Sequence, residues 1–211
     1  MKDFSQKYLD LLTGEFEGIN LTRIESPEEF YQKQIVDSVK PMEESKIFKK
    51  CLEATKIMVD IGFGGGFPIL PMAYANPDKK FFGFDARAKK AQVVQQIANR
   101  LDLKNATLRH QRFEHILFDR DVVVTFKAVG KVSDLLPMFK TNNNLYVFFY
   151  KGPNFYELED FEDLLDDWEV IEEISYDVEG TDGRLFLGFK NKNVLRGTKT
   201  TEKIIKFSSL L

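Results

Sequence analysis

The sequence predicts a doubly wound α/β fold: a mostly parallel sheet with helices on both faces, an antiparallel strand pair at one end, and a small N-terminal helical element. Three observations support this prediction. From residue 56 onward, short apolar runs alternate with helical patterns, which is typical of parallel strands joined by crossover helices. A glycine-rich turn directly follows the first of these runs. The last two runs have no helix between them.

The N-terminal part is predicted to be helical. Apolar residues recur at helical spacing over residues 4–12. A second helix is indicated by Ser26 as N-cap and Pro27 at the first helical position. We expect it to end near Val39, because Pro41 disfavours helical backbone in the residue before it.

The apolar runs define the expected sheet. Strands are expected at 56–61, 79–85, 106–110, 121–128, 144–152, 168–176 and 184–192. Helices are expected at 67–75, 86–101, 112–118 and 131–140. The turn signal "GTDG" separates the last two strands, which should therefore form an antiparallel pair at one end of the sheet.

These patterns divide the chain into three parts: an N-terminal helical element (1–50), an α/β domain (51–190) and a basic tail (191–211). The tail carries five basic residues against one acidic residue, and we expect it to fray, as termini commonly do.

Composition limits the class of protein. The chain has 211 residues, of which 43% are hydrophobic and 30% charged, as in a soluble globular protein. No apolar run reaches the roughly 18 residues of a membrane helix, and no signal-peptide pattern opens the chain. One cysteine, Cys51, excludes an internal disulfide. We therefore expect a cytoplasmic protein without a membrane partner, and most simply a monomer.

Charge is distributed unevenly along the chain. The net charge is -3, yet residues 157–182 hold 13 acidic residues and no lysine or arginine. The rest of the chain is therefore basic, and a polyanion responds to that local field rather than to the total. An acidic, solvated face is the simpler interpretation, and charge alone does not choose between the two.

The glycine turn indicates a nucleotide-like ligand. A strand ending in Asp60 leads into Gly62, Gly64 and Gly66, where the backbone can turn sharply and a ligand can approach closely. The next strand ends at Asp85, whose carboxylate is placed to accept hydrogen bonds from ribose hydroxyls.

Phe67 argues against a dinucleotide, whose fingerprint has glycine or alanine three positions after Gly64. The pattern Asp-x-Gly-x-Gly-x-Gly is instead similar to that of S-adenosylmethionine (SAM) methyltransferases.

The residue types restrict the reaction that such a donor would serve. Carbon methylation of a pyrimidine usually needs a cysteine nucleophile, and Cys51 lies before the turn. Amine methylation typically uses an Asn/Asp-Pro-Pro-aromatic loop, where this chain has "TFKAVG". His110 and His115 lack the companions of a metal site, so we expect no metal. A target that already offers a lone pair, such as a ring nitrogen, remains.

At this point the sequence resembles the methyltransferase G family, also called glucose-inhibited division protein B. The resemblance rests on "NLTRI", "QIVDSV", "VDIGFGGGFPILP", "FFGFDARAKK", "LKNATLRHQRFE", "DVVVTFKAVG", "FYKG" and "GRLFLGFK". It implies a class I SAM-dependent methyltransferase fold, SAM as cofactor, and methylation of guanine N7 in 16S ribosomal RNA, with that RNA or the small ribosomal subunit as partner.

The resemblance also implies roles for single residues. The cofactor site would comprise Asp60, Gly62, Phe63, Gly64, Gly66, Phe67, Asp85, Ala86, Phe113, Glu114 and Lys127. Asn20, Lys33, Lys151 and Arg184 match polar or basic positions that face cofactor or RNA. Lys127, in a catalytic positioning role, occurs where the family has arginine if one residue is inserted; without the insertion that position is Phe126. Phe63 replaces a usual serine or threonine.

Two alternatives stay open for Asp60, which could contact the ligand or cap the amides of the turn. Two other functions also stay open: a SAM methyltransferase acting on a non-RNA substrate, and a non-catalytic RNA-binding or ribosome assembly factor.

Overall fold

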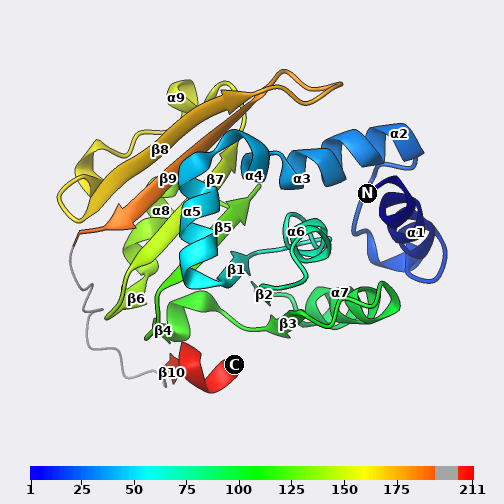
Figure 1. Ribbon diagram of the computed structural model, residues 1–211, viewed down its shortest axis with the longest axis horizontal. Coiled ribbons are helices and arrows are strands. Elements are labelled where there is room, and N and C mark those ends of the chain that lie inside the picture. Colours follow the sequence, from blue (N-terminus) through cyan, green and yellow to red (C-terminus); the bar gives the residue numbers. More distant parts are fainter. Residues whose placement is uncertain (193–203) are drawn as a thin grey trace.

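The computed structural model describes residues 1–192 and 204–211, and its centre is a seven-stranded sheet (Figure 1). The strands are β1 (Ile57–Ile61), β2 (Lys80–Asp85), β3 (Ala106–His110), β5 (Val122–Lys127), β7 (Leu145–Lys151), β8 (Trp168–Tyr176) and β9 (Arg184–Asn191). Their order is β3-β2-β1-β5-β7-β9-β8; the first five are parallel and β9 is antiparallel to both its neighbours. The predicted doubly wound sheet with an antiparallel end pair is confirmed.

Apolar side chains of the central strands point alternately to the two faces of the sheet, and each face is covered by other elements. On one face lie Met58, Phe81, Val123 and Phe148. On the other lie Val59, Phe82, Val124 and Phe149.

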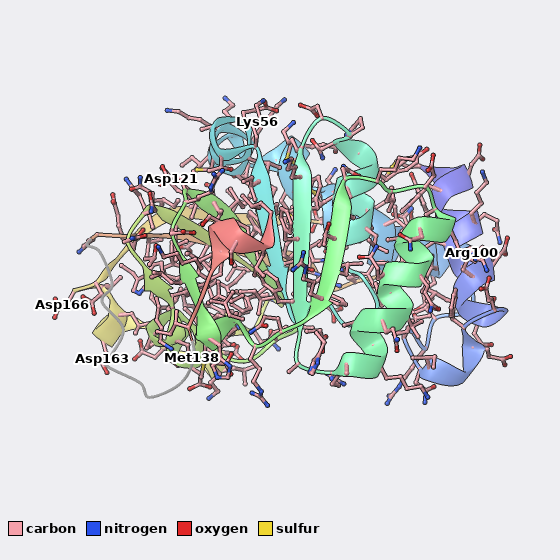
Figure 2. All side chains as sticks on the ribbon, turned by 90° about the horizontal axis from the view of Figure 1, so that it is seen from below. Lys56, Arg100, Asp121, Met138, Asp163 and Asp166 are labelled. Atoms are coloured by element: carbon pink, nitrogen blue, oxygen red, sulfur yellow. The ribbon has the colours of Figure 1, made fainter. Side chains whose placement is uncertain are left out.

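The first face is covered by the helices that precede β1 and by the two that follow β1 and β2. These are α1 (Lys2–Thr13), the 3₁₀ turn η1 (Glu17–Ile19), α2 (Pro27–Phe30), the π-helical η2 (Tyr31–Val36), α3 (Asp37–Val39), α4 (Pro41–Glu44), α5 (Lys46–Thr55), α6 (Ile69–Ala75) and α7 (Ala88–Arg100). Figure 2 shows side chains filling the space beside the sheet, with α1 outermost next to α7. There Arg100 forms an ion pair with Glu15 at 2.8 Å.

The predicted end of the second helix near Val39 is confirmed, since α3 ends at Val39, but the chain does not turn away there. Lys40 keeps α-helical backbone angles, and Pro41 occupies the first position of α4. Proline is tolerated there because the first amides of a helix need no partner inside it. The chain turns only at Ser45, whose hydroxyl caps α5 by accepting from the Phe48 amide at 2.9 Å.

The second face is covered by α8 (Val132–Leu135), η4 (Leu136–Met138), α9 (Phe155–Leu158), η5 (Glu162–Leu164) and a small parallel sheet, β10-β4-β6. The small sheet consists of β4 (Ile116–Phe118), β6 (Lys140–Thr141) and β10 (Ile205–Lys206). The expected helix at 131–140 is therefore shorter, because its last residue pairs as β6.

The expected helix at 112–118 is wrong. The segment forms one 3₁₀ turn, η3 (Phe113–His115), followed by β4. Ile116 and Phe118 are fully buried while Leu117 between them is half-buried, so the apolar period here is two rather than that of a helix.

The end of the chain packs against the domain. Residues 204–211 form β10 and the 3₁₀ turn η6 (Phe207–Leu210), and the ring of Phe207 is fully buried against Phe82, Phe84 and Phe118. The expected fraying is wrong for these residues, because burial of a phenylalanine ring offsets the entropy of ordering the terminus. The other residues of the expected tail, 193–203, lie outside the described residues. No helix within residues 1–192 or 204–211 is long and apolar enough to cross a membrane.

Candidate cofactor and substrate cleft

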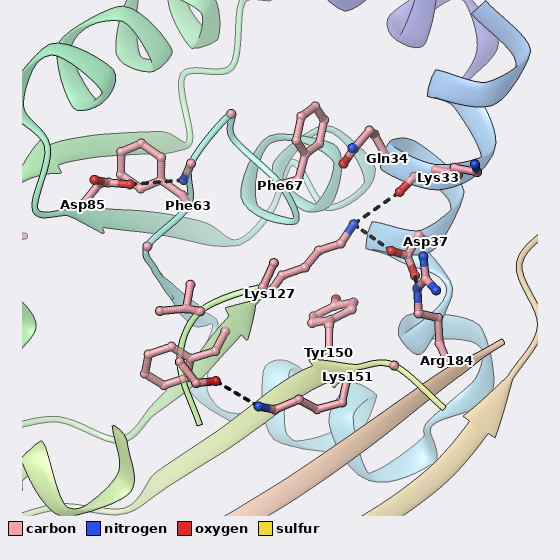
Figure 3. A pocket seen from close by; sticks show the side chains of 18 of the residues that line it. Lys33, Gln34, Asp37, Phe63, Phe67, Asp85, Lys127, Tyr150, Lys151 and Arg184 are labelled. Atoms are coloured by element: carbon pink, nitrogen blue, oxygen red, sulfur yellow. Dashed lines mark hydrogen bonds and ion pairs between the residues drawn. The ribbon is translucent and has the colours of Figure 1, made fainter. Parts of the chain in front are cut away.

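A cleft of about 960 Å³ opens where β1, β2, β5 and β7 end, with the helical segment 27–39 as its opposite wall (Figure 3). The chain leaves β1 toward β2 on one side of the sheet and reaches β5 on the other, so the cleft lies at the topological switch point. Its lining includes Lys33, Gln34, Asp37, Gly62, Phe63, Gly64, Gly65, Phe67, Asp85, Ala86, Arg87, Phe126, Lys127, Tyr150, Lys151, Glu159 and Arg184.

The glycine turn forms the floor of this cleft, but its glycines make room for different neighbours. A Cβ on Gly62 would lie 2.6 Å from Val129 Cγ2, in the loop after β5. A Cβ on Gly66 would overlap the hydroxyl of Tyr8, and Gly66 does not line the cleft. A Cβ on Gly64 would have only the Gly62 carbonyl within 4 Å, at 3.8 Å. Gly64 is therefore the open point of the turn.

Asp85 faces that open point from the end of β2. Its Oδ2 accepts from the Gly64 amide at 3.2 Å and its Oδ1 from the Arg87 amide at 2.8 Å (Figure 3). A carboxylate offers about four acceptor positions, so Asp85 retains capacity for two more donors. Ala86, the next residue in the chain, also lines the cleft.

Phe63 has a structural explanation. Its ring is only 2% exposed, and a Cβ on Gly83 of the neighbouring strand β2 would lie 2.7 Å from it. The same Cβ would lie 2.4 Å from Leu108. The ring therefore fills the space that Gly83 leaves, beneath the turn.

Asp60 lies inside the sheet and does not line the cleft. It is fully buried, and its Oδ1 accepts from the Thr125 hydroxyl at 2.8 Å. Its Oδ2 has no hydrogen-bond partner among the described residues. Desolvation by burial is the largest influence on the Asp60 carboxyl and holds its pKa well above the ordinary value.

The wall opposite the turn contains a buried ionic cluster. Lys127 and Arg184 were identified as candidates from the sequence, but their counterion, Asp37, was not. Asp37 is fully buried, and its carboxylate lies 2.8 Å from Lys127 Nζ and 3.2 Å from Arg184 Nε (Figure 3). The Tyr176 hydroxyl lies 3.3 Å from the same carboxylate. Lys127 also donates to the Lys33 carbonyl at 3.4 Å, within the π-helical turn η2.

Burial and the ion pair with Asp37 act in opposite directions on the pKa of Lys127. Desolvation is its largest influence and lowers its pKa, while the charge and hydrogen bond of Asp37 oppose that shift. Asp37 lies in "QIVDSV", between apolar residues of a predicted helix. A carboxylate among apolar residues was the signal by which the sequence could have indicated this cluster.

Lys151 and Glu159 close the other side of the cleft. Lys151 Nζ lies 2.6 Å from Glu159 Oε1 and donates to the Gly130 carbonyl at 3.0 Å. Glu159 Oε2 accepts from the Val132 amide at 2.8 Å. This pair ties the loop after β5 to the end of β7, so Lys151 is engaged within the protein.

Besides Asp60 and Gly66, three further candidate residues lie away from the lining. Phe113 is 6% exposed, and its ring contacts the rings of Phe126 and Phe139 in the core. Glu114 pairs with Arg112 at 3.1 Å. Asn20 ends η1 with a left-handed backbone, φ 51°. The structure thus brings together the turn, Asp85, Ala86, Lys33, Lys127, Lys151 and Arg184.

This strand order, with a cleft at the switch point beside a glycine turn, defines the class I SAM-dependent methyltransferase fold. A solved structure shares the architecture: magnesium protoporphyrin IX methyltransferase from Synechocystis PCC 6803 with bound SAH has a TM-score of 0.53 and 14% sequence identity, covering 89% of this chain and 99% of that one.

The chain belongs to the GidB family, rRNA small subunit methyltransferase G, whose sequence profile matches residues 2–181. It is similar to the ribosomal RNA small subunit methyltransferase G of Clostridium perfringens (strain 13 / Type A), with 33% identity over 159 residues, covering 71% of this chain and 64% of that protein. The protein of that name from Solibacter usitatus is 32% identical over 151 residues, covering 70% and 69%. The match thus spans about two thirds of these relatives' length.

Proposed function

We propose that this chain transfers a methyl group from SAM to guanine N7 of 16S ribosomal RNA. The observation that carries the proposal is Asp85, whose carboxylate stands at the end of β2 and faces Gly64 across the floor of the cleft. That placement suits a ribose beside a close backbone approach, and the family relationship supports both cofactor and substrate.

The residues present fit SAM. Gly64 leaves space where a side chain would otherwise stand, and Asp85 has acceptor capacity for two ribose hydroxyls. The cleft volume lies within the roughly 300–1,000 Å³ of small-molecule sites. When bound, SAM supplies an electrophilic methyl group on a sulfonium centre. The protein's part is to bind and orient that group and its acceptor.

The polar groups of the cleft favour an acceptor that needs no deprotonation. All three carboxylates in the lining are engaged: Asp37 with two cations, Glu159 with Lys151, and Asp85 with two amides. The described lining residues include no cysteine or histidine. Guanine N7 offers a lone pair directly, so catalysis rests on alignment of nitrogen, methyl and sulfur.

In this proposal Lys127 positions the reactants rather than moving a proton. Its ammonium is held by Asp37 and the Lys33 carbonyl and points across the cleft (Figure 3). A fixed cation there can orient the polar edge of a purine or the charged end of SAM. Lys127, Lys151 and Arg184 are engaged with protein carboxylates, so they shape the site and are not free to follow an RNA backbone.

The two most solvent-accessible cations of the lining serve the RNA. The side chain of Arg87 is 70% exposed, and that of Lys33 is 33% exposed and pairs with Glu29 at 2.6 Å on the outer surface. We propose that these contact phosphates of 16S ribosomal RNA, alone or within the small-subunit particle, and that the enzyme acts in the cytoplasm as a monomer. Affinity should then fall as salt rises.

Two measurements test the proposal. Calorimetry should show SAM binding that Asp85→Ala abolishes and the exposed control Asp166→Ala preserves. Mass-spectrometric mapping of 16S ribosomal RNA from a deletion strain should show one N7-methylguanine missing, restored by the wild-type chain but not by Asp85→Ala. No SAM binding together with an unchanged set of N7-methylguanines would refute it.

A further inference from the structure

The first helix, α1, forms a hydrogen bond with the glycine turn. The Tyr8 hydroxyl of α1 donates a hydrogen bond to the carbonyl oxygen of Gly65, 57 residues further along the chain. Tyr8 is fully buried, so water does not compete for this carbonyl. Burial also raises the pKa of Tyr8 well above its ordinary value, which keeps the hydroxyl protonated as a donor.

Aromatic packing reinforces this contact. The Tyr8 ring stacks on Phe67, at the end of the turn, with centroids 5.1 Å apart and an interplanar angle of 25°. Phe30 of α2 meets the edges of both rings, at 5.7 Å from Tyr8 and 5.6 Å from Phe67. The three rings fix the position of α1 relative to the turn, so the Tyr8 hydroxyl has a defined direction.

At two glycines of the turn, an added Cβ would point toward the N-terminal segment rather than into the cleft. A Cβ on Gly65 would lie 2.5 Å from the carbonyl oxygen of Leu21, and one on Gly66 would overlap the Tyr8 hydroxyl. Backbone atoms and a buried ring cannot move aside cheaply. The turn therefore has one face toward the cleft, at Gly64, and one face toward the N-terminal segment.

The turn is thus held between two side chains. On the cleft side, Asp85 accepts from the Gly64 amide at 3.2 Å. On the far side, Tyr8 holds the carbonyl of the next residue, Gly65. Rotation of the backbone between Gly64 and Gly65 would break one or both hydrogen bonds. Tyr8 and Asp85 therefore fix the orientation of the turn together.

We propose that Tyr8 is a positioning residue for the cofactor: its hydroxyl holds the glycine turn in the orientation that places Gly64 and Asp85 for SAM. This inference rests on the proposed function and adds a residue of the N-terminal helix to the cofactor-binding apparatus. Helix α1 is then part of the SAM site, although Tyr8 itself does not line the cleft.

Calorimetric titration of SAM into Tyr8→Phe tests the inference, because phenylalanine keeps the stacked ring and removes only the hydroxyl. We expect the Kd to rise about fivefold to tenfold, as for loss of one buried hydrogen bond, with the number of binding sites unchanged. Tyr74→Phe is the matched control: Tyr74 stacks on Phe4 of α1 at 4.3 Å but is 43% exposed, and its Kd should stay at the wild-type value.

Amide hydrogen exchange of residues 62–67 gives a readout without ligand, and it should be faster in Tyr8→Phe than in Tyr74→Phe. A wild-type Kd and unchanged exchange in Tyr8→Phe would overturn the inference while leaving the proposed function intact. A reduced number of sites at unchanged Kd would also overturn it, since Tyr8 would then support only the fold. Absence of SAM binding by the wild-type chain would overturn both.

Discussion

Replacement of Asp37 by asparagine should destabilise the protein strongly, because Asp37 is the counterion of two cations in the cleft wall. Its side chain is 1% exposed, and those of Lys127 and Arg184 are 14% and 23% exposed. Breaking a buried ion pair costs about 3–5 kcal/mol. Solvent reaches both cations in part, so we expect a loss of about 3 kcal/mol and a Tm lower by about 6–12 °C.

A double-mutant cycle measured by urea unfolding isolates this interaction. Asp37→Asn, Lys127→Met and the double variant should show a coupling free energy of about 1–3 kcal/mol, since methionine keeps the shape of the lysine stem without its charge. Asp177→Asn, at an exposed aspartate beside the same strand end, should stay within about 0.5 kcal/mol of wild type. Additive effects of the two cluster substitutions would refute the assignment of Asp37 as the counterion.

Three further predictions follow from buried groups. Because the pKa of Asp60 is raised in the folded protein, the stability of the wild type falls as pH rises above the ordinary carboxyl value of 3.8. The stability of Asp60→Asn relative to wild type, measured by urea unfolding, should therefore rise with pH over that range, and a constant difference would contradict this. Gly83→Ala should cost about 1–3 kcal/mol because its Cβ would meet both Leu108 and Phe63, and Phe63→Ala should relieve part of that cost; equal penalties in both backgrounds would show that the ring is not an obstacle. Phe207→Ala should cost about 3–5 kcal/mol in thermal unfolding, whereas an unchanged Tm would mean that the terminal turn adds nothing to the core.

The sheet and its glycine turn were predictable because their signals are local. Apolar runs of strand length and the spacing between the turn and Asp85 follow from a few adjacent residues. The helix at 112–118 was mispredicted because the structure of this segment depends on residues that are distant in sequence. Ile116 and Phe118 alternate over only three residues, and β4 forms because β6 and β10, far away in sequence, lie beside it.

The roles of the cleft lysines could not be predicted because their partners are distant in sequence. Lys127 pairs with a carboxylate 90 positions earlier, and the residues around it carry no sign of that pairing. Lys151 pairs with Glu159, which belongs to the acidic segment 157–182, for which a solvated face was the simpler of the two interpretations left open. At least one of those acids therefore turns inward and serves the cleft.

Because of these pairings, the charge that a ligand meets depends on the residues lining the cleft and not on the net charge of each chain segment. Five basic and three acidic residues line it, so the cleft keeps a positive surplus although the whole chain carries -3. Asp37 and Glu159 neutralise cations inside the wall, which leaves the exposed Arg87 and the partly exposed Lys33 as the positive groups of the lining that solvent reaches most. A polyanion would then meet positive charge at the mouth of the cleft, while the interior holds charged groups that are fixed in place by pairing with one another.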